Sequence, residues 1–163
     1  MKEPPSAPQP PAHAVTITRT SVLPIDRAAL WEVVGTMDGV NAELMPLIRM
    51  TSPKEARGFR IEDAPLGQVA FKSWLLLGGL LPVDLHALRL FEVHPGHGFV
   101  ESSTSWLQSL WRHERTLQDT PEGCRITDTV TFVPRLGLAA PLTRLIVGAV
   151  FSHRHRRLQN RHA

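Results

Sequence analysis

The residues best suited to chemistry lie on two strands that the sequence predicts on either side of a short turn, Thr120–Gly123. Alternate side chains share one face of a strand, and the mixed apolar faces of these two strands should look inward. If the turn is centred on Pro121 and Glu122, residues directly across the hairpin can be assigned. This register opposes Trp111 with Phe132, His113 with Val130, and Arg115 with Asp128.

His113, Arg115 and Asp128 therefore form the candidate site. An Arg115–Asp128 pair inside a cavity would be costly to break, since losing one partner leaves an unpaired charge at about 3–5 kcal/mol. Three interpretations stay open. In the first, which we favour, the pair has a structural role and joins two strands. In the second, the three residues anchor a polar head group. In the third, they act as an acid–base set on a bound substrate. A register shift of one residue would remove the pairing.

Other polar residues are weaker candidates. One face of the strand Phe99–Trp106 carries Glu101, Ser103 and Ser105, and the pattern does not decide whether this face or the opposite one is inward. Cys124 is the only cysteine, so no intrachain disulfide is available, and no base is evident beside it. His153 and His155 point in different directions on a helix. The sequence therefore predicts no metal and no cofactor.

A block of strands positions these residues. The sequence predicts a first strand at Val15–Val22, a short helix at Arg27–Val34 capped by Asp26, and a second short helix capped by Asp38. Further strands are expected at Ile48–Ser52, Gln68–Leu77, Val83–Val93, Phe99–Trp106, Trp111–Gln118 and Cys124–Val133. Because no helices alternate with these strands, the predicted sheet is antiparallel, with about six or seven strands.

A long helix at Leu138–Leu158 completes the predicted α+β fold. Its apolar residues recur at helical spacing and should pack on the curved sheet, leaving an apolar pocket between them. This predicted face consists of Leu142, Leu145, Ile146, Ala149 and Val150. The basic end, with Arg154, Arg156 and Arg157, is interpreted as a solvated helix end, with transient contact to an anionic membrane as the alternative.

Composition limits the remaining options. A chain of 163 residues fits one domain, predicted at residues 14–160 after a Pro-rich flexible tail at residues 1–13. The net charge of +3 is small for a nucleic-acid binder. The tail has no apolar signal segment, and no stretch is long and apolar enough to span a bilayer, so we expect a cytoplasmic protein.

Several segments resemble the START-like SRPBCC superfamily, which includes the birch-pollen-allergen fold and polyketide cyclase/dehydrase-like proteins, and in particular its bacterial stand-alone ligand-binding members. The matching segments are Leu90–Pro95, Phe99, Trp111–His113, Thr127–Val130 and Phe151–Leu158. The resemblance implies a helix-grip fold, in which a curved sheet wraps around the C-terminal helix and encloses a cavity for a hydrophobic ligand. It does not imply a single activity, since this scaffold serves binders, transporters and enzymes.

The leading functional hypothesis is a non-catalytic binder or carrier of a lipid-like or polyketide-like molecule, acting as a monomer or homodimer without nucleic acid. A cyclase or dehydratase using His113, Arg115 and Asp128 is the second hypothesis, and a ligand-sensing interaction module is the third. The predicted ligand-binding residues are Phe71, Trp111, His113, Arg115, Asp128, Val130, Phe132, Leu145 and Ala149.

Overall fold

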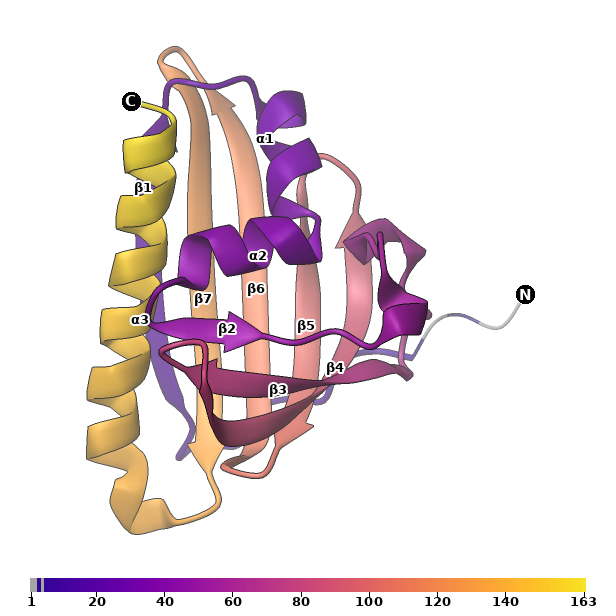
Figure 1. Ribbon diagram of the computed structural model, residues 1–163, viewed down its shortest axis with the longest axis vertical. Coiled ribbons are helices and arrows are strands. Elements are labelled where there is room, and N and C mark those ends of the chain that lie inside the picture. The colour runs from indigo at the N-terminus through magenta and orange to yellow at the C-terminus, as the bar shows by residue number, and fades with distance from the viewer. Residues whose placement is uncertain (1–2, 4) are drawn as a thin grey trace.

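A curved antiparallel sheet wraps around a long C-terminal helix (Figure 1). The computed structural model describes residues 3 and 5–163. Within these residues the seven strands are ordered β1–β7–β6–β5–β4–β3–β2. The strands are β1 (Val15–Leu23), β2 (Ile48–Met50), β3 (Val69–Leu77), β4 (Leu81–His94), β5 (Gly98–Ser105), β6 (Gln108–Thr120) and β7 (Gly123–Pro134). The helices are α1 (Arg27–Val34), α2 (Met37–Leu44) and α3 (Ala140–Arg161), with short 3-10 helices η1 (Lys54–Ala56), η2 (Ile61–Asp63) and η3 (Gly137–Ala139). The predicted helix-grip fold is confirmed.

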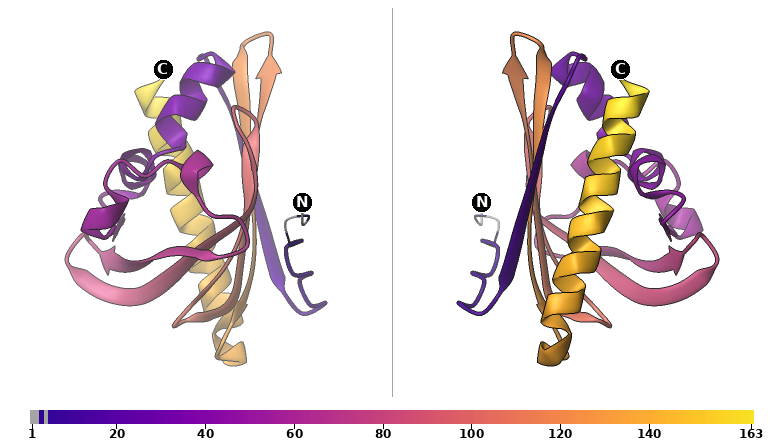
Figure 2. Two further views of the ribbon diagram at one scale, coloured as in Figure 1. Left: turned by 90° about the vertical axis from the view of Figure 1, so that its right-hand side faces the viewer. Right: turned by 90° about the vertical axis from the view of Figure 1, so that its left-hand side faces the viewer.

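The side views show how the sheet forms a grip (Figure 2). Helix α3 lies against one face of the long strands, and β2, β3 and β4 curl toward the same side. The N-terminal segment runs along the opposite face. The sequence predicts a flexible tail at residues 1–13. Of this range, Met1, Lys2 and Pro4 lie outside the described residues, and residues 5–11 contain no helix or strand.

The first helix forms as the sequence predicts, and the second begins differently. Asp26 caps α1, because its carboxylate accepts hydrogen bonds from the backbone N–H groups of Ala28 and Ala29. The cap of α2 is Thr36, whose hydroxyl accepts from Gly39 N at 3.0 Å. The prediction that Asp38 is this cap is wrong: Asp38 lies in the first turn, where its negative charge suits the helix dipole.

Helix α3 packs on the sheet through a different face from the predicted one. Its buried residues are Val147, Gly148, Phe151, Arg154, His155 and Leu158. Leu142, Leu145 and Ile146 are exposed, with Leu145 at 70%. The apolar periodicity predicted the wrong face because two polar residues, Arg154 and His155, occupy the buried one. Only the outer part of the basic end is exposed, at Arg156 and Arg157.

Candidate functional site

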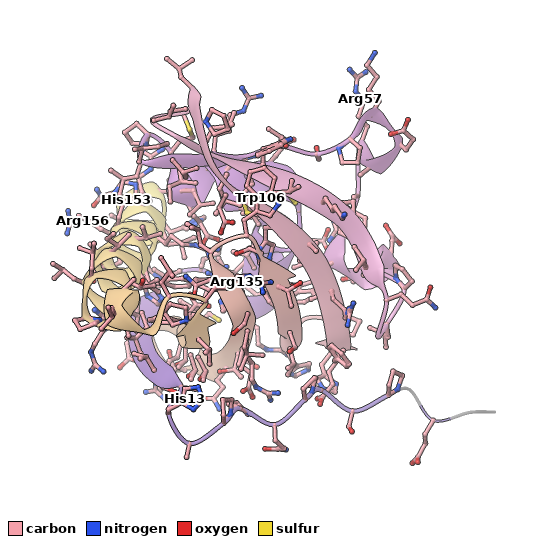
Figure 3. The ribbon with its side chains drawn as sticks, turned by 90° about the horizontal axis from the view of Figure 1, so that it is seen from below. His13, Arg57, Trp106, Arg135, His153 and Arg156 are labelled. Carbon is pink, nitrogen blue, oxygen red and sulfur yellow. The ribbon has the colours of Figure 1, made fainter. Side chains whose placement is uncertain are left out.

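A cavity of about 520 Å³ lies between the sheet and α3. Its walls are mostly apolar and come from α1, α2, β2, β3 and α3, including Leu44, Phe59, Leu75, Leu142, Ile146 and Val150. Trp106 and Arg135 lie at its mouth, between α3 and the strands in the view from below (Figure 3). The cavity size falls in the range typical of small-molecule sites, about 300–1,000 Å³.

Polar groups occupy one wall of this cavity, which is built by β4, β5 and β6. Their inward positions alternate along each strand, so that polar side chains line up from the mouth to the floor. Near the mouth are Asp84, Ser105 and Gln108; deeper are His86, Glu101, His113 and Arg115. The inward face of β5 is therefore the one with Glu101, Ser103 and Ser105, which the sequence left undecided.

The hairpin register predicted from the turn is confirmed: Arg115 opposes Asp128, His113 opposes Val130, and Trp111 opposes Phe132. Arg115 donates two hydrogen bonds to the Asp128 carboxylate, from Nε to Oδ1 and from Nη2 to Oδ2, each at 2.7 Å. Both side chains are 1% exposed. A bidentate pair of this kind fixes geometry as well as supplying energy.

The pair belongs to a larger buried network that joins the sheet to two helices. Glu43 of α2 accepts from Arg115 Nη1 at 2.8 Å and from Nη2 at 2.9 Å. Arg154 of α3 donates from Nε to Glu43 Oε2 at 2.8 Å. Glu43 therefore lies between two guanidinium groups and links α2, α3 and β6.

Two histidines complete the contacts of Asp128. Nε2 of His113 lies 2.7 Å from Oδ1, and Nε2 of His155 lies 3.0 Å from Oδ2. The other ring nitrogen of His155 lies 2.8 Å from the hydroxyl of Ser21 on β1. Asp128 thus connects strands β1, β6 and β7 with α3.

The arginines decide the charge states of the buried carboxylates. Burial alone would raise the pKa of Asp128, but the Arg115 guanidinium outweighs it and holds this pKa well below its ordinary value. For Glu43, burial is likewise outweighed by Arg115 and Arg154, and its pKa is lowered. Burial would lower the pKa of Arg115, yet Asp128 and Glu43 raise it. At neutral pH Asp128 and Glu43 are therefore carboxylates and Arg115 is a cation.

Most of the hydrogen-bonding capacity of this network is used within it. Four of the five N–H groups of Arg115 donate, and both oxygens of Asp128 accept twice. A ligand head group could bind Asp128 only by breaking an existing bond. Of the three interpretations of Arg115 and Asp128, the contacts favour the structural one.

A second polar pair faces the cavity more directly. Nε2 of His86 on β4 lies 2.5 Å from Oε1 of Glu101 on β5. The hydroxyl of Ser103 donates to the same oxygen at 2.7 Å, and Nδ1 of His113 lies 3.7 Å from Oε2. Burial would raise the pKa of Glu101, but the nearby His86 and His113 outweigh it and lower this pKa. Nδ1 of His86 has no hydrogen-bond partner in the described part of the chain.

The predicted ligand-binding residues separate into three groups. Trp111, His113 and Arg115 line the cavity. Phe71, Asp128, Val130 and Phe132 are buried but do not line it; Phe132 stacks on Trp111 with ring centroids 6.1 Å apart. Leu145 and Ala149 border a separate open groove beside β1, so their predicted place in the cavity wall is corrected.

Sequence reasoning missed Glu43, His86, Gln108 and Arg135 as cavity or network residues, and it left the orientation of the strand face with Glu101 undecided. For His86 and Glu101 a signal exists, because each alternates with residues on an inward strand face. For Glu43 there is none, since its partners Arg115 and Arg154 are far away in sequence. In residues 3 and 5–163, no group of three or more His, Cys, Asp and Glu side chains is arranged to hold a metal ion. No helix in this described part is long and apolar enough to cross a membrane.

The architecture and the cavity define the class: a helix-grip fold, the fold of START-like SRPBCC proteins. The Zhui aromatase/cyclase from Streptomyces sp. R1128 is similar over 91% of this chain and 93% of its own, with 12% identity and a TM-score of 0.66. Protein CV1439 from Chromobacterium violaceum covers 89% and 95%, with 14% identity and a TM-score of 0.65. A START superfamily protein from Mycobacterium smegmatis covers 90% and 96%, with 9% identity and a TM-score of 0.62. At these identities the likeness shows the fold alone.

Within this class the sequence defines a narrower family. Residues 21–162 match the family described as Domain of unknown function (DUF8410), and the chain belongs to it. No curated protein matches the sequence. The function must therefore be argued from the cavity itself.

Proposed function

We propose that the protein binds a hydrophobic small molecule, lipid-like or polyketide-like, in the cavity between the sheet and α3. The observation that carries this proposal is the size and lining of the cavity: about 520 Å³, with mostly apolar walls and one polar wall. Burying apolar ligand surface against such walls contributes about 25 cal/mol per Å². The polar wall would orient the ligand through a few hydrogen bonds.

In this proposal residues 14–160 form the binding domain and the Pro-rich segment before them is a separate tail. Asp128, Val130 and Phe132 support the residues that line the cavity. Trp111 and His113 contact the ligand directly. The expected cytoplasmic location stays a prediction.

Native mass spectrometry of freshly purified protein tests the proposal, followed by extraction under denaturing conditions. We expect a discrete additional mass that is released on denaturation and identifies the ligand class. If the protein is recovered only in its bare form and also shows no saturable binding of dodecanoate, dodecanol, naphthoate or naphthol, the proposal is wrong.

Acid–base catalysis on the bound molecule is a second candidate, supported by the His86–Glu101 contact. A carboxylate that holds one ring nitrogen leaves the other, Nδ1 of His86, free to exchange a proton with a ligand. We place this pair ahead of His113, Arg115 and Asp128 as the candidate catalytic set, because Nε2 of His113 and both oxygens of Asp128 are already engaged. With the ligand identified by extraction, His86→Ala should abolish any product formation while binding persists; unchanged turnover would exclude His86.

A further inference from the structure

Polar groups without a partner lie at the mouth of the cavity, whereas most of the polar atoms at its floor are engaged. At the floor, Arg115, Asp128 and Glu43 satisfy one another. At the mouth, the side chain of Gln108 is only 7% exposed, and its Oε1 has no hydrogen-bond partner within the described residues. A buried amide left unpaired costs about 1–3 kcal/mol, and a ligand donor, or a ligand acceptor once the amide is turned over, would recover this cost.

Arg135 lies next to this amide. Gln108 starts β6 and pairs with Pro134 at the end of β7, and the backbone N–H of Arg135 donates to Leu107 O at 3.0 Å. Nε of Arg135 donates to the backbone oxygen of Ser105 at 2.9 Å, which holds the guanidinium at the mouth. Its two terminal nitrogens have no carboxylate partner in residues 3 and 5–163. The edge formed by these two nitrogens is therefore available to a ligand. A guanidinium edge of this kind can bind a carboxylate through two parallel hydrogen bonds.

The electrostatic surroundings favour an anion at this position. Helix α3 begins beside the mouth with no side chain capping its first turn, and the N-terminal end of a helix dipole is positive. Ala139, Leu142 and Thr143 from this region line the cavity. The acidic group nearby, Asp84, is buried and already accepts from Ser105 Oγ at 2.6 Å and from the backbone N–H groups of Leu85 and Leu107.

We propose that the ligand is an amphipathic carboxylate whose acid group binds Arg135 and Gln108 at the cavity mouth, with its apolar body against the apolar walls formed by α2, β3 and α3. This inference rests on the proposed function and specifies the ligand class and its orientation. The Gln108 amide can present either its oxygen or its NH₂ group, so it pairs with a carboxylate in either protonation state. The orientation is the reverse of one anchored by His113, Arg115 and Asp128.

Matched probes test the proposal: dodecanoate against dodecanol, and naphthoate against naphthol, measured by quenching of Trp106 and Trp111, which line the cavity. We expect the acid in at least one pair to bind about tenfold more tightly than its neutral analogue, the factor that one charge-assisted contact supplies. Arg135→Gln should remove this preference while leaving binding of the neutral analogue unchanged. Gln108→Leu should weaken acid binding several-fold.

Arg144→Gln is the matched control, because Arg144 is an exposed arginine of α3 that does not line the cavity; it should keep the preference for the acid. Equal binding of acid and neutral analogue by the unmodified protein, or an unaltered preference in Arg135→Gln, would overturn this inference and leave the proposed function standing. Absence of saturable binding by all four probes would overturn both.

Discussion

Arg115 is the residue on which the buried network depends, because it contacts both Glu43 and Asp128 and so joins α2 to the sheet. A guanidinium suits this position, since its planar set of donors serves two carboxylates at once. A lysine would supply one point charge and leave carboxylate oxygens unpaired. These contacts favour a role for Arg115 in stabilising the fold around the cavity.

Asp128→Asn is expected to lower the free energy of unfolding by about 3–5 kcal/mol, because the change leaves buried cations without their carboxylate partner. Arg112→Ala is the control: its pair with Glu114 is partly exposed, and the loss should stay below about 1 kcal/mol. Urea unfolding followed by circular dichroism measures both. A double-mutant cycle with Arg115→Met and Asp128→Asn should give a clear coupling energy; a coupling of zero would contradict the pair.

The lowered pKa values of Asp128 and Glu43 predict a loss of stability in acid. Between the native and unfolded pKa values, the unfolded chain binds more protons than the native one. The stabilisation is therefore fully present above the ordinary carboxyl pKa of about 4 and is lost as the pH falls below it. Urea midpoints measured from about pH 6 to pH 3 should decline, and more steeply than those of Asp128→Asn. Parallel declines would show that Asp128 does not contribute.

At the scale of elements, local rules predicted the hairpin and failed on the long helix. The turn at Thr120–Gly123 fixes the β6–β7 register over a short chain distance, so the opposition of Arg115 and Asp128 follows from the sequence. In α3, the residues Leu142, Ile146 and Val150 of the predicted face line the cavity without being fully buried, whereas Phe151 and Arg154 line it and are also buried. Apolar periodicity does not distinguish a packed face from one that borders a cavity. Periodicity also places Arg154 in solvent, because its partner Glu43 lies on a helix far away in the sequence.

Phe151→Ala tests the corrected face of α3. Phe151 is 2% exposed and packs near Trp111, so its truncation should destabilise the protein by about 3–5 kcal/mol. Leu145→Ala, at a position 70% exposed, should change stability by no more than about 0.5 kcal/mol. Guanidinium unfolding of the two variants compares them directly. If Leu145→Ala lost more stability than Phe151→Ala, the face predicted from periodicity would be the packed one.

At the scale of the whole molecule, the buried network and the cavity depend on each other. Glu43 of α2 binds both Arg115 on the sheet and Arg154 of α3. These contacts set the distance between the two helices and the strands, and the cavity lies in the space between them. Hydrophobic residues alone would favour closer packing at this position, since interiors approach the density of organic crystals. We infer that the charged contacts at the floor hold α2 and α3 away from the strands and so preserve the cavity.

Binding of anilinonaphthalene sulfonate tests the central claim, that this cavity takes up a hydrophobic molecule. Val150 lines the cavity and Leu145 does not, although both lie on α3. The unmodified protein should bind one probe molecule with saturation in a fluorescence titration. Val150→Trp, with its fold verified by circular dichroism, should lose this binding because the added ring fills the cavity, and Leu145→Trp should retain it. Equal binding by Val150→Trp would place the ligand elsewhere and contradict the account.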